Sequence, residues 1–106
     1  MALPSVTAFT ALTAVGPTAF VANSAASFVF QVVVATIGTN VVVRLQGSND
    51  GTNFFNLQAS DNTITANGVY GYAIANTPCL YVRANLITIL TGSPTVTITL
   101  AQDNAP

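Results

Sequence analysis

The chain has 106 residues, only 5% of which are charged, and its formal net charge is −1 at pH 7. The absence of His, Lys and Glu removes the usual general bases, and one Cys without any His cannot build a zinc site. Two arginines are too few for the cationic surface that nucleic acids require. These observations predict a single domain, residues 1–106, with no enzymatic activity, no metal, no cofactor and no nucleic-acid partner.

The composition also indicates an assembly that is made without export. No apolar run reaches the roughly 18–20 residues of a membrane span, and the first 15 residues lack the basic region of a signal peptide. Copies of a protein with so little charge repel one another weakly, and open sheet edges then promote association. We therefore expect cytoplasmic synthesis, no membrane association, and a homo-oligomer or structural particle whose contacts cover the sheet edges.

Apolar and polar residues alternate with a period of two along much of the chain, which predicts β-strands. The clearest case is the last one, where Val96, Ile98 and Leu100 face inward between outward threonines. In chain order the candidate strands are residues 6–13, 18–22, 27–36, 41–46, 54–58, 63–66, 69–75, 80–86 and 95–100. The pattern predicts an all-β fold, an antiparallel β-sandwich of jelly-roll type with about eight short strands, and loose arms at 1–5 and 103–106.

Turn signals separate these candidate strands. They are Gly16-Pro17, Gly38-Thr39-Asn40, Asn49-Asp50-Gly51, Asn67-Gly68, Asn76-Thr77-Pro78 and Gly92-Ser93-Pro94. Asn49, Asp50 and Gly51 tolerate positive φ, so they predict a tight hairpin that leads into a return strand at 52–57. Asn and Asp oxygens can also hold Ca²⁺, but their spacing is not that of an EF-hand loop, which favours the turn role. Asn67 and Gly68 predict a second turn of this kind.

The run 28–37 is apolar on both faces of its predicted strand. Phe28 and Phe30 share one face, and Val29 and Val33 lie on the other. Because the outer face of a two-layer sandwich is normally wet, a second apolar face predicts a neighbouring subunit. The alternative is that valine serves β propensity alone. Phe28 and Phe30 are therefore candidate interface residues.

Arg44 and Arg83 each lie in the middle of a predicted strand between apolar neighbours. A charge at such a position must reach water or find a partner, and Asp50 and Asp61 are the candidates within the chain. Arginine is also favoured at protein interfaces because of its planar fork of donors. A solvated outer face and a subunit or scaffold contact remain equally open for both arginines.

Tyr70 and Tyr72 lie two residues apart and so share a strand face. Such a pair can form a platform on which a sugar stacks. More often, tyrosines at these positions close the edge of a sandwich core and keep the hydroxyl group in water. Both roles remain open from the sequence.

Residues 41–57, VVVRLQGSNDGTNFFNL, resemble a pattern found in small virion proteins of tailed phages. The pattern is a Val-rich strand, a Gly-Ser-x-Asp-Gly-Thr turn, then an aromatic pair and Leu. The later segments 81–86, YVRANL, and 91–100, TGSPTVTITL, fit the same pattern. The resemblance covers about half of the chain, from residue 41 to residue 100.

The resemblance implies a structural role in a phage particle, most directly as a capsid decoration (cement) protein on the capsid surface. Such a protein is made in the cytoplasm of the bacterial host and ties capsid subunits together. We expect a homotrimer with the major capsid protein or another virion protein as partner. The alternatives are a carbohydrate- or cell-surface-binding module of a fibre or adhesin, and a small tail or baseplate subunit.

Overall fold

The computed structural model describes residues 4–9, 11–22 and 27–103. This part of the chain contains β-strands and no helix, and all strand pairs are antiparallel. The strands are β1 (Pro4–Ala8), β2 (Gly16–Pro17), β3 (Val21–Ala22), β4 (Phe28–Ser48), β5 (Phe55–Asn56), β6 (Asn62–Ile64), β7 (Gly68–Ile74) and β8 (Tyr81–Asp103). The predicted all-β antiparallel fold is confirmed.

Two long strands, β4 and β8, form the backbone of the sheet. They pair from Phe28 opposite Gln102 to Ser48 opposite Tyr81. The N-terminal strands β1, β2 and β3 run along the outer edge of β8, and β5, β6 and β7 run along the outer edge of β4. On either side of the bend, β4 and β8 are therefore flanked by further strands, while around residues 35–40 and 88–95 no described strand pairs with their outer edges.

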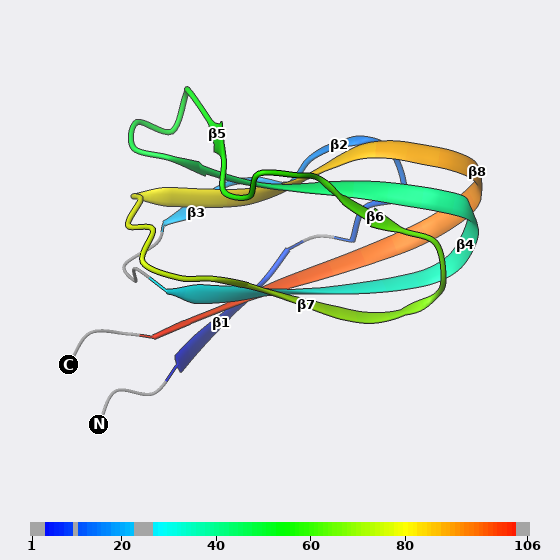
Figure 1. Cartoon of the computed structure of the whole chain (residues 1–106), viewed down its shortest axis with the longest axis horizontal. Helices are drawn as coiled ribbons and strands as arrows, with labels where there is room; N and C mark the ends of the chain where they lie inside the picture. The colour runs from blue at the N-terminus through cyan, green and yellow to red at the C-terminus, as the bar shows by residue number, and fades with distance from the viewer. Residues whose placement is uncertain (1–3, 10, 23–26, 104–106) are drawn as a thin grey trace.

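This sheet folds back on itself into two layers (Figure 1). The lower layer holds β1, residues 95–103 of β8, residues 28–35 of β4, and β7. The upper layer holds β2, β3, β5, β6 and the remaining halves of β4 and β8. Both long strands cross from one layer to the other at the end of the molecule that lies opposite the two termini.

The core lies between the layers and follows the predicted alternation. Phe30, Val32 and Val34 of the lower layer are buried, as are Val41 and Val43 of the upper layer. On β8 the buried side chains alternate in the same way; they are Val82, Ala84, Leu86, Val96, Ile98 and Leu100. The outward threonines of the last segment are exposed or half-buried. Each long strand thus contributes one apolar face to both halves of a single core.

The corner between the layers is built where β4 and β8 approach most closely. Ile37 pairs with Gly92, and the register shifts on either side of this pair. A Cβ atom on Gly38 would overlap the backbone carbonyl of Thr91. Thr36 and Thr91 adopt left-handed φ values of 53° and 61°, which β-branched residues rarely do. Glycine is required at 38 because only a backbone without a side chain fits there.

Hydrogen bonds between the two strands hold this corner. The Thr36 hydroxyl lies 3.0 Å from the Ser93 carbonyl oxygen, and the Thr39 amide donates to Oγ of Thr91 at 2.9 Å. The amide of Ile37 donates to Oδ1 of Asn67 at 2.8 Å, which ties the connection between β6 and β7 to the same place. Side chains thus form hydrogen bonds with backbone amide and carbonyl groups that would have bonded to the neighbouring strand in a regular β-ladder.

Several predicted boundaries differ from the structure. The signals at 38–40 and 92–94 are wrong as turns between separate strands, because they face each other as bends within β4 and β8. The hairpin after β4 is not tight, since residues 49–54 form a loop before the short strand β5. Pro4, Ser5 and Asp103 of the predicted arms belong to β1 and β8, while residues 1–3 and 104–106 lie outside the described residues.

Substitution of Gly38 by Ala should therefore destabilise the fold by about 1–3 kcal/mol, the usual cost of overpacking a tight site. Gly71 in β7 is the matched control, because a Cβ atom there meets nothing within 4 Å. Gly71→Ala should change the free energy of unfolding by no more than about 0.5 kcal/mol. Urea unfolding followed by circular dichroism measures both variants, and equal effects would contradict the role assigned to the corner.

Candidate functional site

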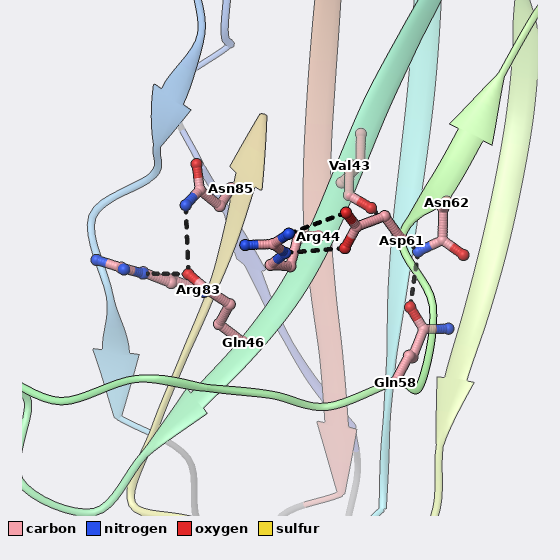
Figure 2. A network of polar contacts seen from close by, with 8 residues as sticks. All are labelled: Val43, Arg44, Gln46, Gln58, Asp61, Asn62, Arg83 and Asn85. Carbon is pink, nitrogen blue, oxygen red and sulfur yellow. Dashed lines mark hydrogen bonds and ion pairs between the residues drawn. The ribbon is translucent and has the colours of Figure 1, made fainter. Parts of the chain in front are cut away.

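The outer face of the upper layer carries both arginines of the chain, in two separate polar groups (Figure 2). Arg44 of β4 donates from Nε to Asp61 at 2.8 Å and from its terminal nitrogen to the second carboxylate oxygen at 3.0 Å. The pair is about one-third exposed on each side. The arginine holds the pKa of the Asp61 carboxyl below its usual range through these hydrogen bonds. Of the two partners that the sequence offered for Arg44, the structure selects Asp61.

Asn62 extends this first group toward the neighbouring loop. Its side-chain amide donates to Oε1 of Gln58 at 2.7 Å and lies 3.3 Å from the carbonyl oxygen of Val43. These contacts fix the segment that carries Asp61 against β4 (Figure 2). The ion pair therefore has a structural role, since it connects an edge segment to the centre of the sheet.

Arg83 of β8 makes no such pair with a carboxylate in the described part of the chain. Its Nε donates to Oε1 of Gln46 at 2.9 Å, and Asn85 lies 3.4 Å from the same oxygen. The guanidinium group lies over the ring of Phe54, 3.8 Å from the ring centre, which is a cation–π geometry. Burial lowers the pKa of the Arg83 guanidinium.

Phe54 belongs to a group of three aromatic rings beside Arg83. The ring centroid of Phe20 lies 5.9 Å from that of Phe54 and 5.2 Å from that of Tyr81. Phe20 is 46% exposed, and the other two rings are half-buried. We call Phe20, Phe54, Tyr81 and Arg83 the aromatic–arginine patch. Three separate stretches of the chain contribute to it.

The loop that presents Phe54 is held by one carboxylate. Oδ1 of Asp50 accepts from the amides of Thr52 and Asn53 at 2.8 Å, and it lies 2.9 Å from the Ser48 hydroxyl. These hydrogen bonds hold the pKa of the Asp50 carboxyl well below its usual range. Gly51 adopts a φ of 76°, the left-handed conformation that was predicted for this turn. Hydrogen bonds between its own residues thus hold the conformation of this loop.

The other predicted turn residues also have identified contacts. Oδ1 of Asn49 lies 3.3 Å from the amide of Leu80, which connects the loop to the start of β8. Asn67 holds the corner through its bond to Ile37, and Gly68 follows it with a positive φ of 156°. Asn49 and Gly51 shape the loop after β4. The prediction of a hairpin-type turn at Asn67 and Gly68 is wrong, because β6 and β7 follow each other along the same edge of β4 and do not pair with each other in the described sheet.

Tyr70 and Tyr72 point toward the interior from the edge strand β7, where they pack against the core. The Tyr70 hydroxyl donates to the carbonyl oxygen of Ala66 at 2.6 Å. Burial raises the pKa of the Tyr72 hydroxyl. Their rings are half-buried, so the geometry favours closure of the core edge over an open platform for a sugar.

The prediction that Phe28 and Phe30 contact a neighbouring subunit is wrong for this structure. Their side chains are 3% and 0% exposed, because they face the second layer of the same chain. The two rings contact each other at 5.9 Å between centroids, and Phe30 also stacks against Phe9 at 6.5 Å. The apolar face that stays open on this strand is the opposite one.

That opposite face covers the outside of the lower layer. Neighbouring rows across β7, β4 and β8 place small or apolar uncharged residues side by side; they are Ala73–Val29–Ala101, Gly71–Gln31–Thr99 and Val69–Val33–Thr97. Val69 is 68% exposed and Val29 is 42% exposed. We call these nine residues the uncharged face. A cavity of about 350 Å³ opens at its end, beside Val29, Ala73 and Ala101.

The described residues hold no group of three or more His, Cys, Asp or Glu side chains that would suit a metal ion. The same part of the chain has no helix long and apolar enough to cross a membrane. The site offers contact area: partly exposed aromatic rings and one guanidinium on the upper layer, and small uncharged side chains on the lower layer.

Sequence reasoning found Arg83 but missed the rings that surround it. Phe54 lies three residues after Gly51, close behind the predicted turn, which is a signal that a loop presents it. Phe20 carries no such signal, because it reaches the patch only through the pairing of β3 with β8.

Comparisons with known proteins place the fold. No protein-family model matches the sequence, and a search of curated proteins finds no match. Among solved structures, the crystal structure of the SPBc2 prophage-derived protein YomS is similar over 96% of this chain and 97% of that chain. The TM-score is 0.62 and the sequence identity is 12%, so the likeness concerns the fold.

The Arg44–Asp61 pair predicts a dependence of stability on pH. The folded pKa of Asp61 is depressed, so the pair stabilises the fold above the ordinary Asp pKa of about 3.9 and this contribution is lost as pH falls through the folded pKa. Because both side chains are partly exposed, Asp61→Asn should cost at most about 1 kcal/mol at pH 6.

Urea unfolding of the wild type and Asp61→Asn between pH 2 and pH 6 checks this, and the two curves should converge at the acid end. The control is the double variant with Arg44→Gln, in which the effect of Asp61→Asn should shrink. A constant difference between the wild type and Asp61→Asn at all pH values would rule out the ion pair as its cause.

Proposed function

We propose that this chain is a non-enzymatic structural protein of a bacteriophage particle and that it acts as a capsid decoration protein. The observation that carries the proposal is the uncharged face of the lower layer. In this proposal the face packs on the major capsid protein, where neighbouring capsid subunits meet, and copies of the chain associate as a trimer. The protein is then located on the capsid surface after synthesis in the bacterial cytoplasm.

The uncharged face suits a permanent contact between proteins. The nine residues that define this face include no charged residue, so burying them leaves no unpaired charge. Exposed apolar residues such as Val29 and Val69 gain from burial, at roughly 25 cal/mol for each Å² of apolar surface. A contiguous exposed face without charge is uncommon on a protein that works alone.

The edge beside this face favours association as well. In the described sheet β7 pairs with β4 on one side only, and residues 68–74, GVYGYAI, carry no charge and no proline. Natural monomers usually protect such an edge with charges, prolines or a covering segment. An open edge here fits the proposal that a neighbouring copy or a capsid subunit covers it.

The fold likeness to a prophage-derived protein supports a phage origin, and the resemblance of residues 41–57 to small virion proteins points the same way. The carbohydrate-binding alternative loses its main support, because Tyr70 and Tyr72 pack against the core. The tail or baseplate alternative predicts rings or tubes of the isolated protein.

Two measurements test the proposal directly. Quantitative mass spectrometry of gradient-purified particles should find the chain at a copy number that matches capsid positions, and gold-labelled antibodies should mark the heads in electron micrographs. Light scattering of the isolated protein should give a trimer mass that does not change with concentration. Absence from purified particles, or labelling confined to tails, would overturn the proposal.

A negative charge on the uncharged face should abolish particle binding. Val69→Glu places a carboxylate at the edge of this face, where it must be desolvated on contact, and affinity for particles that lack the chain should fall at least about tenfold. Thr63→Glu is the matched control, because Thr63 is exposed on the neighbouring edge strand β6 of the other layer.

Co-sedimentation with particles measures both variants, and thermal unfolding confirms that they are folded. Thr63→Glu should bind like the wild type, and wild-type binding should change little between low and moderate salt because the contact is uncharged. If both variants bind equally well, or if moderate salt releases the wild type, the uncharged face is not the contact.

A further inference from the structure

We propose that the aromatic–arginine patch of the upper layer is a second binding site, which takes a protein segment that presents a carboxylate beside an apolar side chain. The site lies on the opposite layer from the uncharged face, so a chain that is seated on a particle through its lower layer keeps this patch open. The inference goes beyond the proposed function and does not depend on it.

The first argument is the charge of Arg83. Of the two basic side chains in the sequence, Arg44 is neutralised by two hydrogen bonds to Asp61. Arg83 has only the neutral oxygen of Gln46 as an acceptor among the described residues, and this contact uses its Nε. Figure 2 shows the end of the Arg83 side chain pointing away from the Arg44–Asp61 pair. Its terminal nitrogens therefore suit a carboxylate from outside.

The second argument is how firmly this guanidinium is held. Gln46 fixes Nε, and the ring of Phe54 supports the plane of the group at 3.8 Å. Phe54 in turn contacts Phe20, which stacks edge-on against Tyr81. A positioned arginine loses less conformational entropy when it binds than a mobile one, which makes Arg83 a strong anchor for a partner.

The third argument is the order of the loop that carries Phe54. Asp50 accepts hydrogen bonds from Thr52 and Asn53, and Gly51 fits beside the rings of Phe20 and Tyr81. Because this loop is already ordered, Phe54 stays partly exposed in one position, and binding a partner costs little further conformational entropy. Interfaces are enriched in aromatic residues and arginine, and their strongest contacts are usually of these types.

The surroundings of Arg83 favour a protein segment with an acidic residue. The rings are two phenylalanines and one tyrosine, and the phenylalanines offer no hydrogen bonds to sugar hydroxyl groups. A second copy of the chain is a poor source of the charge, because the two carboxylates whose side chains are described, Asp50 and Asp61, are both engaged within their own chain. The matching partner is an acidic and apolar stretch of another protein.

The test uses the full-length chain and a random 12-residue peptide library displayed on a carrier unrelated to this protein. Selection on the immobilised wild type should enrich peptides in which Asp or Glu neighbours an aromatic or aliphatic residue. The affinity of these peptides should fall at least about tenfold in Arg83→Gln, the loss expected when one member of a close charge pair is removed. Moderate salt should weaken their binding.

Arg44→Gln is the matched control, because it removes the same charge from the same outer face and leaves the patch intact. It should change peptide affinity by less than about twofold, as expected for a charge outside the contact. Phe20→Ala tests the rings in a variant that keeps the cation, and it should weaken binding as well. Thermal unfolding checks each variant, since Arg83→Gln also removes a contact with Gln46.

The outcomes are decisive for this site and separate from the particle experiment. No enrichment, enriched peptides without acidic residues, or equal binding to Arg83→Gln would each overturn the inference. A glycan array forms the second arm, and binding of anionic glycans that depends on Arg83 would overturn the assignment to a protein partner. If the wild type fails to bind particles but still binds the selected peptides through Arg83, only the proposed function is refuted and the inference about the patch stands.

Discussion

The whole architecture depends on the close approach of Gly38 in β4 to Thr91 and Gly92 in β8. Two long paired strands would otherwise form one extended ribbon with an apolar face open to water. The bend brings the two halves of that face together, so that Phe30 and Leu45 become parts of one core. The strained φ values of Thr36 and Thr91 are tolerated because burial on both sides of the corner offsets their cost, about 1–3 kcal/mol for each residue.

The same bend distributes charge between the two outer faces. It sends the half of β4 that carries Arg44 and the half of β8 that carries Arg83 to the upper layer. In the lower layer, positions 29–33 of β4 and 97–101 of β8 place only Val, Gln, Thr and Ala on the outer side. One sheet thus acquires two chemically different surfaces from strands that are continuous between them. A protein with two unlike faces is suited to bridging two unlike partners.

The sequence predicted those features of the fold that depend on local pattern, and the rest depended on pairing between distant residues. Alternation identified the buried side of each strand, although it could not say that Phe28 and Phe30 face a layer of their own chain. Gly38-Thr39-Asn40 has the composition of a turn, and only its contact with Thr91 makes it a bend. Phe20 and Phe54 meet because β3 and the loop after β4 both border the start of β8, which no local pattern records.

The scarcity of charge makes the placement of each charged group informative. Asp50 orders a loop, and Asp61 neutralises Arg44, so both have a task within the chain. Among the described side chains no carboxylate pairs with Arg83; Gln46 and Phe54 hold it in place but do not neutralise it. A half-buried cation costs free energy through desolvation, and a methionine of similar length would cover Phe54 without that cost. The charge is best explained by an anion outside the chain, which the fold has positioned Arg83 to meet.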